Sequence, residues 1–516
     1  MQAASAEARS RHVSSERPRR ASRSICKSPD KRPRRGSKSR RRIESHCAPH
    51  SFTYAFHLPM NYLLALWCLS LAMLRQRKMA LLFPILCFFT PKGFGLIDVA
   101  ALPYLSLNRA IVLFMMLSFV LYVMAAGFRI KQTHFPLASA FTILGLSFLA
   151  SLVSNPDTWA SDAVTTFMLF SELFFPCFLI WNFCQSSRDA ERALRYIYIA
   201  GIVASIYGTV AFATHFNPFL DYMKMTTPTG RVLAADYSGS VRGARAVGMM
   251  SNAITYGAFQ AMTFLIGIFL LRANRSASRL LWYVLGQLVL FVGIFATGSR
   301  TPLVFALFST LAFVCLARTR HKIVVVQVGV AVCAIASVIG LQYIEKVMDF
   351  ALSVFSANSA ASQSGSSLDM RLGQALIAWN FFTDAPWFGG GVSKTRSILS
   401  SGAYPDFYGA ESAIFQWAID MGAFGLFAFV ALFTRIFAQA RKLPNQSGRA
   451  VVVGMTAGYI VFVISTGVLE TMQFFLAIVV LMFIAEGRRV SAPGRYHAQE
   501  RIAHDAISAE RAQPLG

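Results

Sequence analysis

Charged residues are scarce in this sequence, and acidic residues are the scarcest of them. Only 14% of the 516 residues are charged, and only 24 residues are Asp or Glu. A typical soluble domain carries about 25% charged residues. Hydrophobic residues reach 55% of the chain, and the mean hydropathy is +0.50. This balance excludes an ordinary soluble domain and favours a protein that lies in a lipid bilayer.

The sequence also lacks the usual signatures of metal and nucleotide chemistry. It has no zinc-ligand motif, no GxSxG motif and no Rossmann fingerprint, and Asp384–Gly391 lacks the Lys-Ser/Thr of a phosphate-binding loop. The eight cysteines form no CxxC pair, and none lies in 215–251 or 344–411. We therefore expect no structural disulfide, no metal site and no cofactor.

The positive charge is concentrated at the N-terminus. Residues 1–50 hold 15 Lys or Arg and four Asp or Glu, within a net charge of +25 for the whole chain. The segment 1–57 is rich in Ser, Arg and Pro, which is the composition of disorder. We interpret it as a solvated cytoplasmic tail or as a stretch upstream of the true translation start, and we expect no nucleic-acid partner.

Long apolar blocks predict an all-α, polytopic membrane bundle. About 20 apolar residues cross the roughly 30 Å of hydrocarbon as a helix. Twelve spans are predicted, at 79–95, 107–127, 135–153, 162–183, 193–214, 252–271, 280–297, 302–317, 323–343, 412–433, 450–468 and 470–486. An additional apolar stretch, 58–74, precedes them.

Short basic connections set the orientation of these spans. They alternate along the chain, and all become cytoplasmic if the span at 79 starts inside. The chain then divides into a bundle over 79–343, one large outer loop over 344–411, C-terminal helices over 412–486 and a cytoplasmic tail over 487–516. The stretch 58–74 breaks the pattern, so it is either interfacial or marks a translation start at Met60 or Met79 instead of Met1.

The outer loop 344–411 has a readable internal order. Ser356–Ser367 is a flexible polar segment. Apolar residues then recur at helical spacing, which predicts an amphipathic surface helix over 369–382. Pro386 and the glycines at 389–391 are expected to end it in a turn.

Four arginines stand on the predicted outer face, where arginine is uncommon. They are Arg242, Arg245, Arg300 and Arg371. The planar guanidinium is suited to phosphate and stays charged, so several of them at one place would form a diphosphate site. The alternative is that each one reaches separately toward lipid headgroups.

Three glutamates accompany them. Glu411 begins the span at 412, where a helix start favours an ionised carboxylate, and it could act as a general base toward a sugar hydroxyl. The alternative is a plain helix-start carboxylate. Glu470 lies on a tight outer turn and could provide a second polar contact. Glu172 lies within a span and is expected to face the bundle interior.

At these residues the chain resembles the O-antigen ligase and polysaccharide polymerase family, over about 107–486. Four motifs carry the resemblance, and each is weak by itself. They are Arg245-Ala-Val-Gly248 with Asn252; Thr297-Gly-Ser299-Arg300; Arg371 with Trp379 and Asp384-Ala-Pro-Trp-Phe-Gly-Gly-Gly391; and Glu411-Ser412 with Gly422 and Gly425.

The resemblance implies glycosyl transfer at the periplasmic face of a bacterial inner membrane, without a metal. The donor would be a glycan on undecaprenyl diphosphate and the acceptor a lipid-linked repeat unit. Glu411, Arg300 and Arg371 would be catalytic. The remaining candidates would bind the diphosphate or the glycan, namely Arg242, Arg245, Gly248, Asn252, Ser299, Trp379, Asp384, Ser412 and Glu470. Membrane lipids, and a chain-length regulator or export machinery, would be further partners.

One departure from the family bears on the type of transfer. Ligases of this family carry His at the position of Glu411. The substitution favours a polymerase of O-antigen, capsule or exopolysaccharide over a ligase that transfers glycan to lipid A core or protein. A transporter of lipid-linked sugars is the alternative from another class, and it should show paired broken helices and intramembrane charges.

Overall fold

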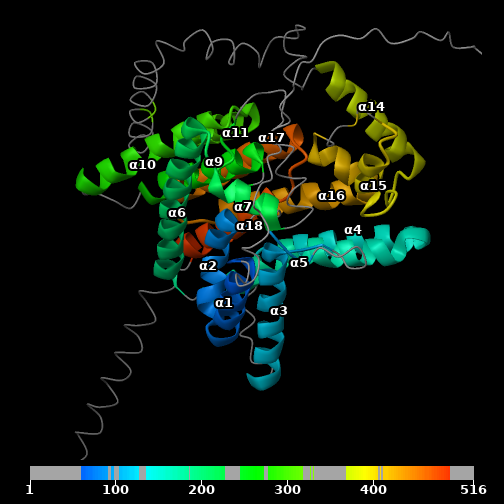
Figure 1. Ribbon diagram of the computed structural model, residues 1–516, viewed down its shortest axis with the longest axis horizontal. Coiled ribbons are helices and arrows are strands. Elements are labelled where there is room, and N and C mark those ends of the chain that lie inside the picture. Colours follow the sequence, from blue (N-terminus) through cyan, green and yellow to red (C-terminus); the bar gives the residue numbers. More distant parts are fainter. Residues whose placement is uncertain are drawn as a thin grey trace, which may run out of the picture. The chain divides into compact units, whose positions relative to one another are not determined.

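The structure is a computed structural model that describes residues 60–90, 94–97, 104–126, 135–184, 186–226, 245–250, 252–271, 277–317, 326, 329, 368–404, 407 and 411–487. Several predictions concern residues outside these ranges. They are the basic tail, the span expected at 323–343 (apart from 326 and 329), the polar segment 356–367, Arg242 and the tail after 487. The described chain is mostly helical (Figure 1).

Each other predicted span coincides with a helix. The N-terminal helices are α1 (Met60–Leu74), α2 (Gln76–Phe89), α3 (Leu107–Ala126), α4 (Ala138–Ser154), α5 (Trp159–Phe183), α6 (Ser187–Thr214) and α7 (Pro218–Thr226), with a 3-10 turn η1 (Pro156–Thr158). They are followed by α9 (Ala253–Leu271), α10 (Ala277–Ala296), α11 (Arg300–Leu316), α14 (Leu368–Asp384), α15 (Lys394–Ser401), α16 (Ala413–Arg441), α17 (Gln446–Ser465) and α18 (Thr471–Gly487).

Six described helices are long and apolar enough to cross a membrane, namely α3, α5, α6, α9, α16 and α17. Five shorter apolar helices, α1, α4, α10, α11 and α18, accompany them. The helical membrane character of the chain is therefore confirmed, while the count of about twelve spans and the outer position of 344–411 stay predictions.

The described part of the apolar stretch 58–74, Met60–Leu74, forms a helix that belongs to the bundle. α1 packs against α2 and α3 and buries Ala65, Cys68 and Ala72. At its start, the Asn61 side chain donates to the Gly95 carbonyl oxygen at 3.2 Å. Gly95 opens a short antiparallel hairpin of β1 (Gly95–Ile97) and β2 (Leu105–Ser106), which the sequence did not predict. The start of α1 therefore lies near Gly95, which follows the end of α2 in the sequence. The two helices thus run antiparallel.

The core gathers around α9 and α18. Every residue of α18 from Thr471 to Glu486 is buried, as expected for a helix that is apolar on all sides. It packs against α5, α6 and α9. The outer helices instead expose large apolar side chains, such as Leu121 of α3, Val210 of α6 and Leu311 of α11. Exposed apolar faces on so many helices are suited to lipid rather than to water.

α11 and α17 approach each other through small residues. A side chain on Gly454 would come within 2.6 Å of the Ser309 carbonyl oxygen, and one on Gly458 within 2.8 Å of the Phe305 carbonyl oxygen. Two glycines four residues apart allow such close backbone contact. The two helices run antiparallel, since the amide of Gln446, the first residue of α17, donates to the carbonyl oxygen of Leu316, the last residue of α11. The start of α11 therefore lies level with the end of α17.

Candidate functional site

Arg371 and Glu411 lie together, although 40 residues separate them in the sequence. Arg371 Nε is 3.9 Å from Glu411 Oε2, and the side chains are 44% and 28% exposed. The Glu411 backbone N–H donates to Gln374 Oε1 at 3.1 Å, and Gln374 is fully buried. α14 thus presents Arg371 to solvent and uses the amide one turn later to hold the backbone of Glu411.

Ser412 and Gln416 connect this pair to the next part of the site. Ser412 is the N-cap of α16, and its hydroxyl oxygen accepts from the Ile414 N–H at 3.3 Å. In the first turn, the Gln416 amide donates to the Gly467 carbonyl oxygen at 3.0 Å. The start of α16 is therefore fixed to the turn between α17 and α18.

That turn carries Glu470, which reaches the start of α9. Glu470 Oε1 accepts from the Thr255 hydroxyl at 2.6 Å. Thr255 lies in the first turn of α9, and Asn252 precedes that turn with its side-chain oxygen accepting from the Ile254 N–H at 2.7 Å. Glu470 and Asn252, predicted as contacts from distant motifs, thus lie at one helix start.

Arg245 and Arg300 lie at the connection between α10 and α11. The Ala246 N–H donates to the Ala296 carbonyl oxygen at 3.1 Å, so the residue after Arg245 contacts the end of α10. The Arg245 Cγ lies 3.9 Å from the position that a Cβ on Gly298 would take. Arg300 is the first residue of α11, and both arginines are half-buried.

Two smaller contacts complete this region. The Gly248 carbonyl oxygen accepts from the Asn217 side chain at 2.9 Å, which anchors the segment that carries Arg245. Ser299 is the N-cap residue of α11 and is buried at 6% exposure. Its backbone N–H donates to the Thr297 hydroxyl at 3.1 Å, so the turn before Arg300 is internally bonded.

The starts of α9, α11, α16 and α18 therefore gather at one end of the described bundle. A helix start carries a partial positive charge and backbone N–H groups with no partner in the helix. Together with Arg245, Arg300 and Arg371, these four starts make an environment suited to an anion. Glu411 and Glu470 are the acidic side chains of the predicted set within it. The positive charge at this end of the bundle is suited to binding an anionic group such as a diphosphate.

Two predicted residues lie elsewhere. Trp379 is two turns along α14 from Arg371, about 12 Å at 1.5 Å per residue, and is 61% exposed. Asp384 is the last residue of α14, about 20 Å along the helix from Arg371. The sequence motif that contains them is continuous, but a straight helix separates its polar positions. Trp379 instead shares an exposed apolar face with Leu372 and Leu376.

Sequence reasoning missed one partner in the interior. Glu172 is buried in α5, as expected, and accepts from Arg109 Nε at 2.6 Å. Arg109 lies in the first turn of α3 and also donates to the Tyr104 carbonyl oxygen at 3.1 Å. The available signal was a second charge at the start of an apolar span. A buried charge in a bundle needs such a partner.

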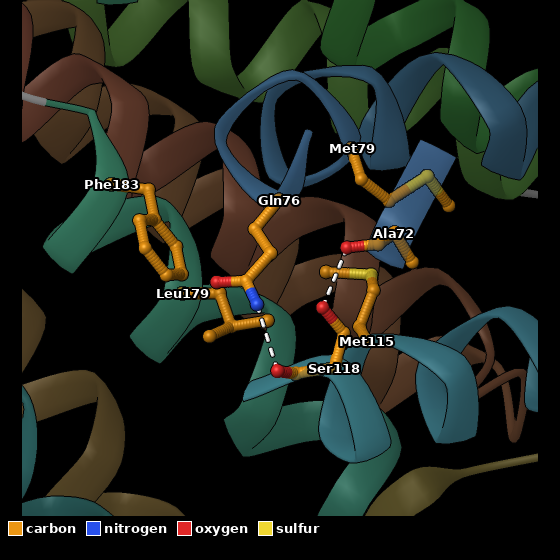
Figure 2. A pocket seen from close by; sticks show the side chains of 7 residues that line it. All are labelled: Ala72, Gln76, Met79, Met115, Ser118, Leu179 and Phe183. Atoms are coloured by element: carbon orange, nitrogen blue, oxygen red, sulfur yellow. Dashed lines mark hydrogen bonds between the residues drawn. The ribbon is translucent and has the colours of Figure 1, made fainter. Parts of the chain in front are cut away.

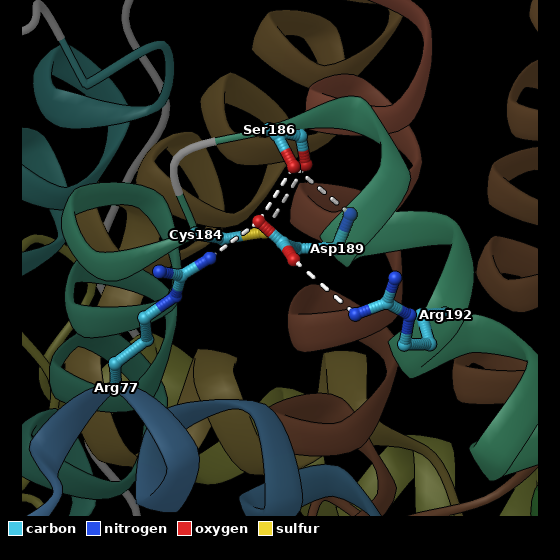
Figure 3. Close-up of polar contacts among 5 residues, drawn as sticks. All are labelled: Arg77, Cys184, Ser186, Asp189 and Arg192. Carbon is cyan, nitrogen blue, oxygen red and sulfur yellow. Dashed lines mark hydrogen bonds and ion pairs between the residues drawn. The ribbon is translucent and has the colours of Figure 1, made fainter.

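The opposite end of the bundle has different chemistry. Figure 2 shows a small crevice where the Gln76 amide donates to the Ser118 carbonyl oxygen and the Ser118 hydroxyl donates to the Ala72 carbonyl oxygen. Arg77, the residue after Gln76, pairs with Asp189 at 2.5 Å, and Asp189 also lies 3.9 Å from Arg192 (Figure 3). Exposed arginines around a shared carboxylate are typical of the cytoplasmic ends of spans.

Part of the chain matches a known protein family. A family model described as O-Antigen ligase matches residues 285–430. That range contains the turn before α11, α11, α14, α15 and the first part of α16, and so it includes Arg300, Arg371 and Glu411. A search of curated proteins found no match. The match supports assignment of this chain to an O-antigen ligase-like family of membrane glycosyl-transfer enzymes.

Proposed function

We propose that the protein is a polymerase of bacterial surface polysaccharide that acts at the periplasmic face of the inner membrane. It would transfer a glycan from undecaprenyl diphosphate to a hydroxyl of a lipid-linked repeat unit. The observation that carries this proposal is the gathering of three arginines, two glutamates and four helix starts at one end of the bundle.

The donor diphosphate is assigned to Arg245, Arg300 and the neighbouring helix starts. Cleavage of the glycosyl bond leaves additional negative charge on the diphosphate. Fixed guanidinium groups and helix N–H groups stabilise that charge without reorganisation, which lowers the barrier. Because the leaving group is already a good one, this stabilisation replaces a metal in the proposed reaction.

Acceptor activation is assigned to Glu411. Its carboxylate is 28% exposed and is positioned by the Gln374 contact to its backbone and by Arg371 beside it. A carboxylate within hydrogen-bond reach of a sugar hydroxyl can accept its proton as the new bond forms. Ser412 has a structural part in this scheme, since its hydroxyl caps α16.

The periplasmic placement is supported by the separation of charges along the helices. The site lies at the starts of α9, α11, α16 and α18, whereas Arg77 and Arg192 lie at the starts of α2 and α6, at the opposite end. Short basic connections are retained on the cytoplasmic side. The site would then face outward.

Transport of lipid-linked sugars receives less support from the same structure. α16 is broken at Gly422, and transporters use such breaks to bind substrate. Here the freed N–H groups of Ala423 and Phe424 donate to the carbonyl oxygens of Pro386 and Trp387, at 2.8 and 3.1 Å. The protein's own backbone occupies the break.

The decisive experiment is reconstitution. Purified protein in lipid nanodiscs, supplied only with lipid-linked repeat units, is expected to produce longer glycans without added metal or nucleotide. Products that stay at one repeat unit would overturn the polymerase proposal. In cells, a deletion strain should display single repeats on its surface; free polymer that is not attached to its anchor would indicate a ligase instead.

A further inference from the structure

We infer that Asp162 and Asp420 are positioning residues that set the placement of Glu411 through the break in α16. This inference rests on the proposed function. Neither carboxylate is among the motif residues that carry the resemblance, although Asp420 lies between Ser412 and Gly422 of the fourth motif. Asp162 lies on α5, which carries none of the predicted catalytic or substrate-binding residues.

The first observation is that the two carboxylates hold the start of α15. Asp162 is fully buried in the first turn of α5, and its Oδ1 accepts from both the backbone N–H and the hydroxyl of Ser393. Asp420 Oδ1 accepts from the Thr395 N–H at 2.7 Å. Two otherwise unpaired N–H groups at a helix start thus receive acceptors from two different helices.

The second observation is that the segment before α15 fills the break in α16. Gly422 has φ 62° and ψ −155°, which divides α16 into an outer piece, 413–421, and a longer inner piece. The Gly390 N–H donates to the Ile419 carbonyl oxygen at 2.9 Å, on the outer side of the break. The contacts of Ala423 and Phe424 lie on its inner side. The segment 386–390 therefore bridges the two pieces of α16.

The third observation is that α4 and η1 brace the same segment. The Asn155 side chain donates to the Gly389 carbonyl oxygen at 3.1 Å, and the Ser151 hydroxyl donates to the Asp420 carbonyl oxygen at 2.7 Å. The Thr158 hydroxyl donates to Asp162 Oδ2 at 2.7 Å, which orients that carboxylate. The contacts of Asn155, Ser151 and Asp162 thus hold the segment between α14 and α15 and the outer piece of α16.

The consequence concerns Glu411 directly. Glu411 leads into the outer piece of α16 with only Ser412 between them, and Arg371 lies on α14, which leads into the segment 386–390. Both partners of the ion pair are thus attached to elements that this network holds. Without the two carboxylates, the segment 386–390 no longer holds the outer piece of α16 at the break. The Glu411 carboxylate then no longer has a fixed position relative to the arginines.

The test compares Asp162→Ala, Asp162→Asn and Asp420→Ala with Asp157→Ala as the matched control, since Asp157 is an exposed carboxylate in the adjoining 3-10 turn. In the nanodisc assay, normalised to folded protein, we expect Asp162→Ala and Asp420→Ala to lower kcat at least tenfold with KM changed less than twofold. Asp162→Asn keeps an acceptor for Ser393 and should retain most of the rate. Asp157→Ala should match the parent protein.

A double-mutant cycle separates positioning from plain stability. If Asp162 acts through Glu411, Asp162→Ala should cost nothing more in a Glu411→Gln background. Equal loss in both backgrounds would overturn the inference. Should Asp162→Ala fail to fold, Ser393→Ala removes one partner of the same carboxylate and takes its place in the cycle.

Amide hydrogen exchange provides a readout that does not need activity. Asp162→Ala should speed exchange in 386–401 and in 411–421 but leave α17 unchanged. Unchanged exchange in 411–421 would overturn the inference even if the proposed function holds. If exchange in 411–421 becomes faster but the parent protein forms no polymer, the two carboxylates still hold the start of α16. The proposed function would then be wrong and the structural part of the inference right.

Discussion

At the scale of single residues, the acid beside Arg371 is the most informative position. The Glu411 side chain is partly exposed, and its Oε2 lies 3.9 Å from Arg371 Nε. We expect Glu411→Gln to lower the rate of glycan transfer by about 10²- to 10⁴-fold, the usual contribution of a general base. The initial rate with lipid-linked repeat units is the measurement. Asp157→Asn, at an exposed carboxylate in η1, is the control and should leave the rate unchanged. A fully active Glu411→Gln protein would show that Glu411 is not the base.

Arg300 tests a different chemical property, the shape of the charge. It lies at the first position of α11. A lysine there would keep the positive charge but would lose the planar set of N–H donors that can bind two phosphate oxygens at once. Arg300→Ala should lower transfer by about 10²- to 10³-fold, the typical effect of losing one charge-stabilising donor, with Arg300→Lys intermediate. Arg396→Ala, an exposed arginine on α15, should have no effect. Equal activity of the lysine and parent proteins would argue against bidentate phosphate binding.

The sequence could predict these residues but not their partners. An arginine on an expected outer turn, or a glutamate at a helix start, stands out because charge is rare there. Partners such as Gln374 and Thr255 are ordinary polar residues within helices, and only the packing of α14 on α16 and of α17 beside α9 selects them. For Trp379 and Asp384, the sequence did not predict the distance from Arg371, and their role in binding stays a prediction. Their motif is contiguous in sequence, but a straight helix carries its ends apart.

At the scale of elements, the break in α16 is the feature that most affects the site. Gly422 has a positive φ, and a Cβ there would come within 2.7 Å of the backbone of Trp387. Gly422→Ala should therefore destabilise the protein by more than the roughly 1–2 kcal/mol that left-handed backbone alone costs an L-residue. Gly402 shares the positive φ but has open space around it, so Gly402→Ala isolates the backbone term. Thermal unfolding in detergent measures both, and equal shifts would contradict the close approach.

The elements also show where periodicity is sufficient and where it is not. The surface helix expected at 369–382 is α14, Leu368–Asp384, because its apolar spacing and the following Pro and Gly are local signals. The break in α16 was not predicted, since Gly422 lies in a mostly apolar segment and glycine is tolerated in membrane helices. The hairpin of β1 and β2 was equally invisible, because its strands span three and two residues.

At the scale of the whole molecule, orientation in the membrane decides whether the site meets an outward-facing substrate. Alternating basic connections predict it, and the separation of the site from the Asp189 cluster agrees with it. The prediction is testable with single cysteines. Ser400→Cys is exposed on α15 beside the site's elements, and Arg188→Cys is exposed near the start of α6. In intact cells, a membrane-impermeant maleimide should label the first and spare the second.

The background for this experiment follows from the native thiols. Cys68, Cys87, Cys177 and Cys184 are buried and should not react, whereas Cys315 is exposed and needs replacement by Ser, together with Cys26, Cys47 and Cys333. Permeabilised cells should label both introduced cysteines, which shows that each one is accessible. Labelling of Arg188→Cys alone in intact cells would show that the arginines of the site and Glu411 face the cytoplasm. A lipid diphosphate presented in the outer leaflet could not then reach them, and the polymerase proposal would fail on geometry alone.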